Sequence, residues 1–329
     1  MDYPLISVIV PAYNAQLWLA DCCQSVFSQS YPHWELIVVD DGSEDETLRV
    51  ANEMAENREN VTVVHTVNKG VSHARNAGLD RAQGTYVTFL DADDTLMTNA
   101  LDFLYQSIVE YDADIAVGKK VTITPNGSEL PSFFPNELEI WSGTEGLEHS
   151  LEDHPATYAV WGKLYKKSLI DDVRFVVGKK IHEDSFFVFE CLMKKPKVIV
   201  LNVPVLRYRL SENSASRAPF SERIFDISFF AQKKKELIEV HYPEFMPLTY
   251  NLMIKASMAL LNNLMRAPGK KYREIEKSNI KLVQQYKAYF ISAISWDTKM
   301  FFIITHHLYY PLKYAYRFKS FLSGRKTHK

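Results

Sequence analysis

VTVVHTVNKGVSHARNAGLDRAQGTYVTFLDADD, residues 61–94, places a strand, a helix and a second strand in succession. The runs 61–65 and 85–91 are rich in β-branched and aromatic residues, as is typical of buried strands. Gly70 permits a turn into a short helix between them. A strand, a helical crossover and another strand form the unit of a parallel sheet, so this stretch predicts an α/β fold.

The same alternation extends on both sides of this stretch. LISVIV (5–10), ELIVVD (35–40) and ADIAVG (113–118) are further short apolar runs separated by helix-like segments. Continuous apolar strands imply a mostly parallel, Rossmann-like sheet with helices on both faces. Such sheets bind ligands at the carboxyl ends of their strands, so the polar residues at those ends are the candidate site.

After residue 118 the pattern changes. A hairpin is expected across 125–127, a helix near 143–153 and a further strand over about 197–210. From about 219 the apolar residues fall at helical spacing. We therefore predict one domain over 1–218 and a basic, helical extension over 219–329.

The formal charge is divided unevenly between these two regions. Residues 1–218 carry 19 Lys and Arg against 32 Asp and Glu, whereas residues 219–329 carry 19 against 8. A basic segment can serve nucleic acid, an anionic membrane surface or only a solvated helical face. Binding to nucleic acid is disfavoured because the acidic sheet-end pockets would repel phosphate unless a metal intervened.

The C-terminal segment 300–329 is the part of the chain that most resembles a membrane-contact sequence. Its apolar run, 300–312, is too short to span a bilayer, which needs about 20 residues, and six basic residues with no acidic one follow. Two interpretations stay open: a helix lying among anionic headgroups, or a terminal helix packed on the protein. The chain's opening lacks a secretory signal pattern, so we expect a cytoplasmic protein, peripheral at the inner face of the plasma membrane.

Polar residues follow the first two strands. Pro11 is expected to end the first strand, presenting Tyr13 and Asn14 at the sheet edge, where an exposed aromatic ring can stack on a base. After the second strand, Asp40 and Asp41 begin the sequence DDGS, and one carboxylate can accept hydrogen bonds from a base or a ribose. The same four residues also suit a turn that caps a helix.

A third set of polar residues follows the strand 85–91. Residues i and i+2 share a face in an extended chain, so Asp91 and Asp93 are expected to project into one pocket and suit Mg²⁺ or Mn²⁺. Acidic residues at such positions also commonly cap strands and helices. Arg75, from the helix before this strand, can reach either a phosphate or a carboxylate, and a structural ion pair with Asp91 is equally consistent.

Several separate motifs together resemble one known family. In order and spacing the chain is similar to a family 2 inverting glycosyltransferase of the GT-A fold and of the bacterial cell-surface polysaccharide type. The resemblance covers roughly residues 5–215. The chain lacks the QxxRW motif that processive synthases of the same superfamily carry. The matching segments are SVIVPAYNA (7–15), ELIVVDDGSEDET (35–47), NKGVSHARNAGLDRAQGTYVTFLDADD (68–94), WGKLYKKSLI (161–170) and IHEDSFFVFECL (181–192).

This resemblance implies a role for each motif. The nucleotide-sugar would be bound by residues of the first three motifs, the metal by the DxD carboxylates, and the acceptor proton would be removed by the ED motif. Direct displacement at an anomeric carbon needs such a base, because an acceptor hydroxyl is a poor nucleophile at neutral pH. The residues concerned are Pro11, Tyr13, Asn14, Asp41, Arg75, Asp91 and Ala92 for the nucleotide-sugar, Asp91 and Asp93 for metal, Asp184 with Glu183 for catalysis, and Trp161, Lys163 and Arg209 for the acceptor side.

The sequence therefore predicts a non-processive enzyme that uses Mn²⁺ or Mg²⁺. It would move one sugar from a nucleotide-sugar, with UDP expected from the resemblance, to a glycan or lipid-linked acceptor in cell-surface polysaccharide synthesis. Two alternatives are a non-catalytic nucleotide-binding homologue and a metal-dependent nucleotidyltransferase. The first would have lost a DxD or ED carboxylate, and the second would carry a Gly- and Lys-rich phosphate loop, yet the carboxylates are present and VPAYNAQLW is no such loop.

Overall fold

The computed structural model describes residues 3–130, 137–210, 221–266, 271–289, 309–311 and 313. They belong to two compact units, Met1–Arg217 and Ala218–Lys329. The first unit carries the sheet, and the second is helical in the residues described.

A ten-stranded sheet forms the centre of the first unit, in the order β3-β2-β1-β4-β9-β6-β10-β5, with β7 beside β6 and β8 beside β10. The first four strands are parallel neighbours, as are β6 and β10, whereas β9 runs antiparallel to β4 and β6. The strands are β1 Ile6–Ala12, β2 Trp34–Asp40, β3 Val61–His65, β4 Tyr86–Phe89, β5 Thr95–Leu96, β6 Ile115–Ile123, β7 Glu129–Leu130, β8 Glu139–Trp141, β9 Lys163–Lys166 and β10 Val198–Arg209.

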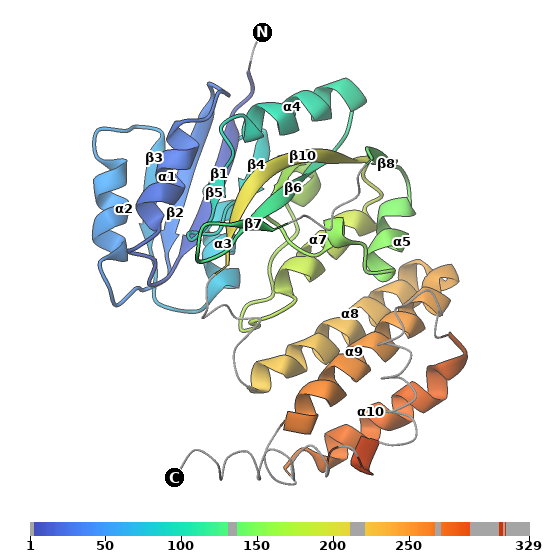
Figure 1. The fold of residues 1–329 in the computed structure, drawn as a ribbon. Helices are drawn as coiled ribbons and strands as arrows, with labels where there is room; N and C mark the ends of the chain where they lie inside the picture. The colour runs from blue at the N-terminus through green and yellow to red at the C-terminus, as the bar shows by residue number, and fades with distance from the viewer. Residues whose placement is uncertain are drawn as a thin grey trace, which may run out of the picture. The chain divides into compact units, whose positions relative to one another are not determined.

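Helices cover both faces of this sheet (Figure 1). In β1, Val8 and Val10 point into one apolar cluster with α1, α2 and α4, while Ile9 points into the other with α3 and α7. This arrangement confirms the predicted mostly parallel α/β sheet flanked by helices. The helices are α1 Leu19–Phe27, α2 Thr47–Ala55, α3 Val71–Leu79, α4 Ala100–Tyr111, α5 Glu145–Leu151, α6 Lys167–Ile170 and α7 Glu183–Met193, with a 3₁₀ turn η1 at Pro155–Thr157.

Two predicted strand ends are wrong. Pro11 does not end β1, which continues to Ala12 with Pro11 opposite Val39 of β2. The strand tolerates this proline because β4 pairs with β1 only as far as Ile9. No β4 carbonyl is therefore left without a donor by the absence of an N–H at Pro11. The strand expected over 85–91 ends earlier, at Phe89.

Other sequence predictions for this unit are confirmed. The hairpin across 125–127 joins β6 to β7, and Gly127 adopts φ +82°, a conformation that favours glycine. The expected helix near 143–153 is α5, and the expected strand over 197–210 is β10.

The described part of the second unit is a set of helices, as predicted for the C-terminal region. Tyr250 of α9 stacks on Tyr286 of α10 with ring centroids 4.3 Å apart, and Lys313 forms a buried ion pair with Glu276 of α10. No described helix combines the length and hydrophobicity that crossing a bilayer requires. The elements are α8 Phe225–His241, α9 Met246–Arg266 and α10 Arg273–Tyr286, with 3₁₀ turns η2 Glu222–Ile224, η3 Pro243–Phe245 and η4 Lys287–Tyr289.

The predicted membrane-contact segment, 300–329, falls almost entirely outside the described residues, which include only 309–311 and 313 of it. Tyr309 is buried and donates a hydrogen bond from its hydroxyl to the carbonyl oxygen of Leu261. The proposed contact with anionic lipid therefore stays a prediction.

Candidate active site

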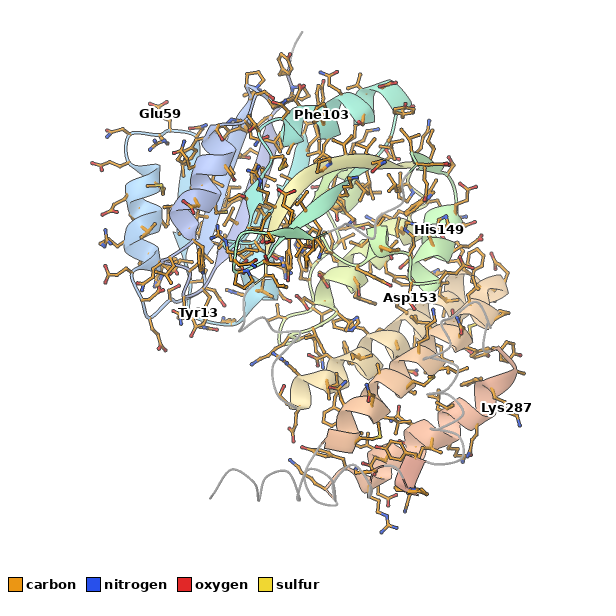
Figure 2. The ribbon with its side chains drawn as sticks, viewed as in Figure 1. Tyr13, Glu59, Phe103, His149, Asp153 and Lys287 are labelled. Atoms are coloured by element: carbon orange, nitrogen blue, oxygen red, sulfur yellow. The ribbon has the colours of Figure 1, made fainter. Side chains whose placement is uncertain are left out.

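The carboxyl ends of β1, β2 and β4 meet at one edge of the sheet, because these strands are parallel neighbours. Figure 2 shows Tyr13, which follows β1, at the opposite side of the first unit from Glu59, which precedes β3. The Tyr13 side chain is 47% exposed. The loops after these three strands carry the predicted nucleotide and metal residues, so the fold brings them to the same edge.

The loop after β1 is tied to the loop after β2 by backbone and side-chain hydrogen bonds. The Asn14 N–H donates to Ser43 Oγ (3.0 Å), and Asn14 Oδ1 accepts from the Glu44 N–H (2.9 Å). Asn14 has φ +50°, a left-handed conformation that asparagine tolerates better than most residues. The Asn14 side-chain oxygen, Oδ1, is thus used to fix the loop, whereas Pro11 is buried within β1.

Asp41 connects the end of β2 to the start of α3. Its carboxylate accepts the Lys69 N–H (3.1 Å) and the Gly70 N–H (2.7 Å), and only 3% of Asp41 is exposed. Gly70 has φ +92°, which allows the chain to turn directly into the helix. Thr66 Oγ1 also donates to Asp41 Oδ1 (3.3 Å). A carboxylate offers about four acceptor positions, so these three bonds leave one position for a ligand N–H.

Arg75 is the buried link between the carboxylates of two motifs. Its guanidinium pairs with Asp91 Oδ1 (2.9 Å) and Glu183 Oε1 (3.2 Å), and its side chain is 5% exposed. It also lies over the ring of Phe175, with 5.3 Å between the guanidinium carbon and the ring centroid. The sequence left open whether Arg75 contacts a phosphate or a carboxylate. The structure shows the predicted ion pair with Asp91 and a second one with Glu183 of α7.

The metal motif forms a turn. The Asp94 N–H donates to the carbonyl oxygen of Asp91 (3.0 Å), so the extended geometry expected for Asp91 and Asp93 is wrong. Burial, followed by the proximity of Asp91, raises the pKa of Asp93. Burial, followed by the proximity of the Asp91 and Asp93 carboxylates, raises the pKa of Asp94 to about 9. Three acidic side chains are therefore crowded into one turn, with Ala92 buried between them.

Arg209, at the end of β10, supports this turn. Its backbone N–H donates to Asp94 Oδ1 (2.8 Å), and its Nε donates to the carbonyl oxygen of Asp93 (3.2 Å). The guanidinium lies over the Trp18 ring, 4.2 Å from its centroid, and its terminal nitrogen is 3.7 Å from Asp21. The resemblance implies an acceptor-side role for Arg209, but no local sequence pattern indicates its contact with the metal motif.

The ED motif lies at the start of α7. The helix begins at Glu183, and the preceding residue, His182, has φ +66° and makes no capping bond with its side chain. Asp184 therefore lies inside the first turn rather than at the helix cap, and its Oδ1 accepts the Ser185 N–H (2.7 Å). Burial raises the pKa of Asp184, while Arg75 partly opposes that rise. A carboxylate with a raised pKa is a stronger proton acceptor.

The predicted acceptor-side residues Trp161 and Lys163 lie in different environments. Lys163 is 4% exposed and donates from Nζ to the carbonyl oxygen of Ala159. Burial lowers its pKa to about 7, although the nearby Asp184 opposes this shift. Trp161 is only partly buried and stacks on Tyr208, with ring centroids 5.8 Å apart. The structure thus leaves the Trp161 ring partly accessible and encloses the Lys163 ammonium.

Among the described residues, no group of three or more His, Cys, Asp or Glu side chains is placed to hold a metal ion. The Asp91 side chain is 29% exposed and contributes one oxygen to its pair with Arg75. Two carboxylates at a partly exposed turn fit a hard cation that takes its remaining ligands from phosphate and water. The donor set is therefore compatible with Mg²⁺ or Mn²⁺ bound together with a nucleotide.

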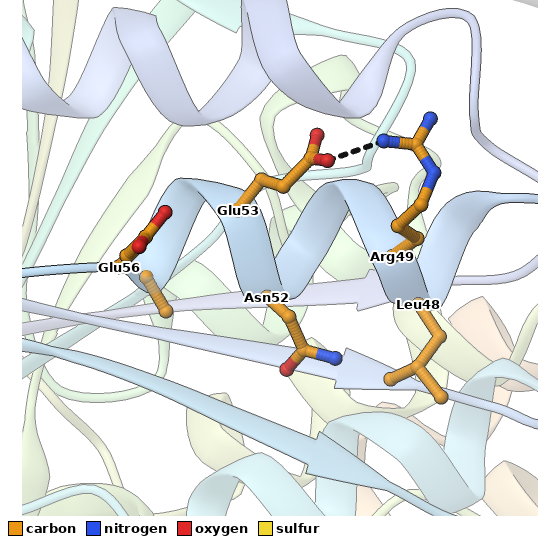
Figure 3. A pocket seen from close by; sticks show the side chains of 6 residues that line it. Leu48, Arg49, Asn52, Glu53 and Glu56 are labelled. Atoms are coloured by element: carbon orange, nitrogen blue, oxygen red, sulfur yellow. Dashed lines mark hydrogen bonds and ion pairs between the residues drawn. The ribbon is translucent and has the colours of Figure 1, made fainter.

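A surface hollow on the first unit is distinct from this edge (Figure 3). It is lined by one helix, α2, and the residue that follows it, and Arg49 there pairs with Glu53. None of its residues was predicted to bind a ligand. They are Leu48, Arg49, Asn52, Glu53, Ala55 and Glu56.

Comparison with known proteins gives the family context. The family model described as Glycosyl transferase family 2 matches residues 7–174. Glycosyltransferase GlyA of Streptococcus pneumoniae is 36% identical over 219 residues, which are 64% of this chain and 31% of GlyA. Poly(ribitol-phosphate) beta-glucosyltransferase of Bacillus spizizenii is 31% identical over 202 residues, 59% of this chain and 30% of that relative. The chain thus spans about a third of the length of these curated relatives.

Solved structures share the fold. S. aureus TarS 1–349 in complex with UDP-GlcNAc has a TM-score of 0.62 at 20% identity, covering 93% of this chain and 91% of that one. The mannosyltransferase PcManGT from Pyrobaculum calidifontis, in complex with GDP-Man and Mn²⁺, has a TM-score of 0.57 at 18% identity, covering 93% and 86%. These similarities confirm the predicted GT-A type of fold.

Proposed function

Because the chain belongs to glycosyl transferase family 2 and is a glycosyltransferase, we propose that it moves one sugar from a nucleotide-sugar to a glycan or lipid-linked acceptor, with inversion at the anomeric carbon. The observation that carries this proposal is the pairing of buried Arg75 with both Asp91 and Glu183. That bridge links the metal motif to the helix turn that holds the base, Asp184.

The nucleotide site in this proposal lies at the ends of β1 and β2. Asp41 accepts a base N–H, and the exposed ring of Tyr13 stacks on the base. Pro11, within β1, and Asn14, in the loop that follows, shape the site. UDP is the proposed nucleotide, supported by the fold shared with TarS, whose structure contains UDP-GlcNAc. The GDP-Man in PcManGT shows that this fold also accommodates a guanine nucleotide, so the nucleotide must be measured.

Asp91 and Asp93 would hold the divalent cation, Mn²⁺ or Mg²⁺, and the Mn²⁺ in PcManGT supports this assignment. When bound, the cation neutralises negative charge on the departing nucleoside diphosphate. The protein's own contribution is to fix the turn, since Arg75 holds Asp91 and Arg209 holds the Asp93 carbonyl and Asp94. Fixed carboxylates cost no reorganisation when the ligand binds.

Asp184 is the proposed general base. Glu183 is already paired with Arg75, whereas the hydrogen bond to the Asp184 carboxylate comes from a backbone N–H. Asp184 can therefore accept the proton of the acceptor hydroxyl as that oxygen attacks the anomeric carbon from the side opposite the leaving group. Such direct displacement inverts the anomeric configuration.

The test compares Asp184→Asn with Glu190→Gln, a carboxylate farther along the same helix. We expect Asp184→Asn to lower turnover by about 100-fold or more, the scale of lost base catalysis, with the dissociation constant for UDP and Mn²⁺ unchanged. Glu190→Gln should retain turnover. Release of UDP measures turnover, calorimetry measures nucleotide affinity, and NMR of the product gives the anomeric configuration. Full activity in Asp184→Asn, or a retained configuration, would refute the proposed mechanism.

The acceptor and the cellular location are also proposals. A relative named as acting on poly(ribitol-phosphate) supports an acceptor of the cell-surface glycan class. Peripheral association with the cytoplasmic face of the plasma membrane through 300–329 rests on the basic and aromatic sequence of that segment. Deleting 300–329 should abolish co-sedimentation with anionic vesicles and leave UDP affinity unchanged, and unaltered sedimentation would contradict the membrane role.

A further inference from the structure

A lysine and two aromatic rings form a cluster beside the acidic turn. Trp161 and Tyr208 are stacked, with an interplanar angle of 28°. Lys120 Nζ lies 4.1 Å from the Tyr208 ring centroid and 4.9 Å from that of Trp161. All three side chains are partly buried, and both rings pack against the apolar cluster that contains Val8 and Val10. The rings are therefore held in place, and Lys120 is not an unconstrained surface lysine.

The ammonium of Lys120 has no hydrogen-bond acceptor among the described residues. Burial lowers its pKa, and the facing carboxyl of Asp94 opposes that shift. The neighbouring Lys119 differs, because its Nζ donates to Asn202 Oδ1. An ammonium carries three donors, and at a partly buried position that solvent still reaches, these donors are available to a ligand oxygen. The Lys120 ammonium can therefore donate hydrogen bonds to a ligand oxygen, whereas the Lys119 ammonium already donates to Asn202.

The sheet order places this cluster beyond the acidic turn from the predicted nucleotide residues. The nucleotide residues follow β1 and β2, the acidic turn follows β4, and β9 and β6 come next in the sheet. Trp161, just before β9, bridges to Phe89 at the end of β4, and Gly118 of β6 donates its N–H to Gly162. Lys120 is two residues beyond Gly118, so the acidic turn separates it from Asp41.

We propose that Lys120, together with the Trp161 and Tyr208 rings, forms a subsite for a negatively charged group of the acceptor, a phosphate or a carboxylate close to the hydroxyl that is glycosylated. The inference rests on the proposed function and narrows its substrate class to anionic glycan acceptors. The ammonium pairs with the anion, and the aromatic faces contact the apolar C–H surface of the adjoining sugar or polyol.

The diphosphate of the donor is the other source of anionic oxygen near this cluster. The two possible ligands predict different effects of removing the Lys120 ammonium on UDP binding. If Lys120 contacts the donor, its removal weakens UDP binding, and if it contacts the acceptor, UDP binding is unchanged. Lys119→Met is the matched control, because Lys119 is the adjacent residue on the same strand and its ammonium is already paired.

The experiment titrates sn-glycerol 3-phosphate, with glycerol as the uncharged probe, into the full chain with and without UDP and Mn²⁺. Loss of a charge-assisted hydrogen bond should raise the glycerol-phosphate dissociation constant about tenfold or more in Lys120→Met. Lys119→Met should match the wild type, Lys120→Arg should retain binding, and no variant should change UDP affinity. Circular dichroism and thermal unfolding establish that each variant is folded.

Three results would overturn the inference: no glycerol-phosphate binding to the wild type, equal binding to Lys120→Met, or a comparable loss of UDP affinity in that variant. The third result assigns Lys120 to the donor diphosphate. Failure of the proposed function would give a different result, because the wild type would then bind no nucleotide. Binding of glycerol phosphate to the wild type and to Lys120→Met would still test the role of Lys120.

Discussion

Two consecutive aspartates lie at the end of β2, Asp40 and Asp41, and two more lie in the turn after β4, Asp93 and Asp94. The two pairs differ in their hydrogen-bond partners. At the end of β2, Asp40 pairs with His65 (2.7 Å) and Asp41 accepts two backbone N–H groups. At the end of β4, the buried Asp94 has one oxygen without any hydrogen-bond partner, and the pKa values of Asp93 and Asp94 are raised.

This difference separates a structural carboxylate from one held for a ligand. Asp41 accepts backbone N–H groups at the start of α3, so that side chain strengthens the fold. Crowding of the carboxylates after β4 lowers stability in the absence of a cation, and such cost is typical of functional sites. Opposite effects of substitution at the two ends are therefore expected.

The largest expected effect comes from Arg75→Met. Removing this guanidinium leaves Asp91 and Glu183 without their buried partner, and breaking a buried ion pair in this way costs about 3–5 kcal/mol. Chemical denaturation of the variant with and without UDP and Mn²⁺ measures the loss. Arg81→Met, at an exposed position just after α3, should change stability little. A loss below about 1 kcal/mol at Arg75 would show that the bridge is not a structural link.

The sequence predicted the sheet and the residues at its edge, because apolar strands and their polar ends are local patterns. It could not predict how far each strand pairs, since the end of β4 at Phe89 and the passage of β1 through Pro11 depend on neighbouring strands. The support of the acidic turn by Arg209 and the burial of Lys163 depend on contacts between distant segments.

Lys120 was missed for a related reason. In sequence it is one of two adjacent lysines in a strand that leads to a turn, which resembles a solvated hairpin arm. Only the pairing of β6 with β10 brings Tyr208 beside it, and only the bridge between Phe89 and Trp161 brings the second ring. Alternation along the strand distinguishes Lys119 from Lys120 but does not reveal which of them meets the aromatic rings.

A smaller loss is expected from Asp41→Ala. The Lys69 and Gly70 N–H groups would lose their acceptor at the start of α3, and losing a side-chain acceptor at a helix start costs about 0.5–2 kcal/mol. Thermal unfolding without ligand measures the change, and Glu44→Ala on the same loop is an exposed control. If Asp41→Ala were as stable as the wild type, the carboxylate would serve ligand binding alone.

The smallest expected change has the opposite sign and depends on pH. Burial and neighbouring carboxylates raise the pKa of Asp94 to about 9, above the value of about 3.9 in an unfolded chain. The folded state therefore holds a proton that the unfolded state releases, and the stability this provides is lost as pH rises from about 4 towards 9. Asp94→Asn mimics the protonated form and should escape that loss.

The free energy of unfolding of Asp94→Asn should accordingly rise relative to the wild type by about 1 kcal/mol between pH 6 and pH 7, measured in a chelator so that no cation neutralises the turn. Asp112→Asn is the control, because that carboxylate is 95% exposed and should not alter the pH dependence. Equal pH slopes in Asp94→Asn and the wild type would mean that Asp94 is ionised in the folded protein. The two strand ends would then share one electrostatic design, with a cation or an arginine balancing the β4 turn as backbone N–H groups balance the β2 loop.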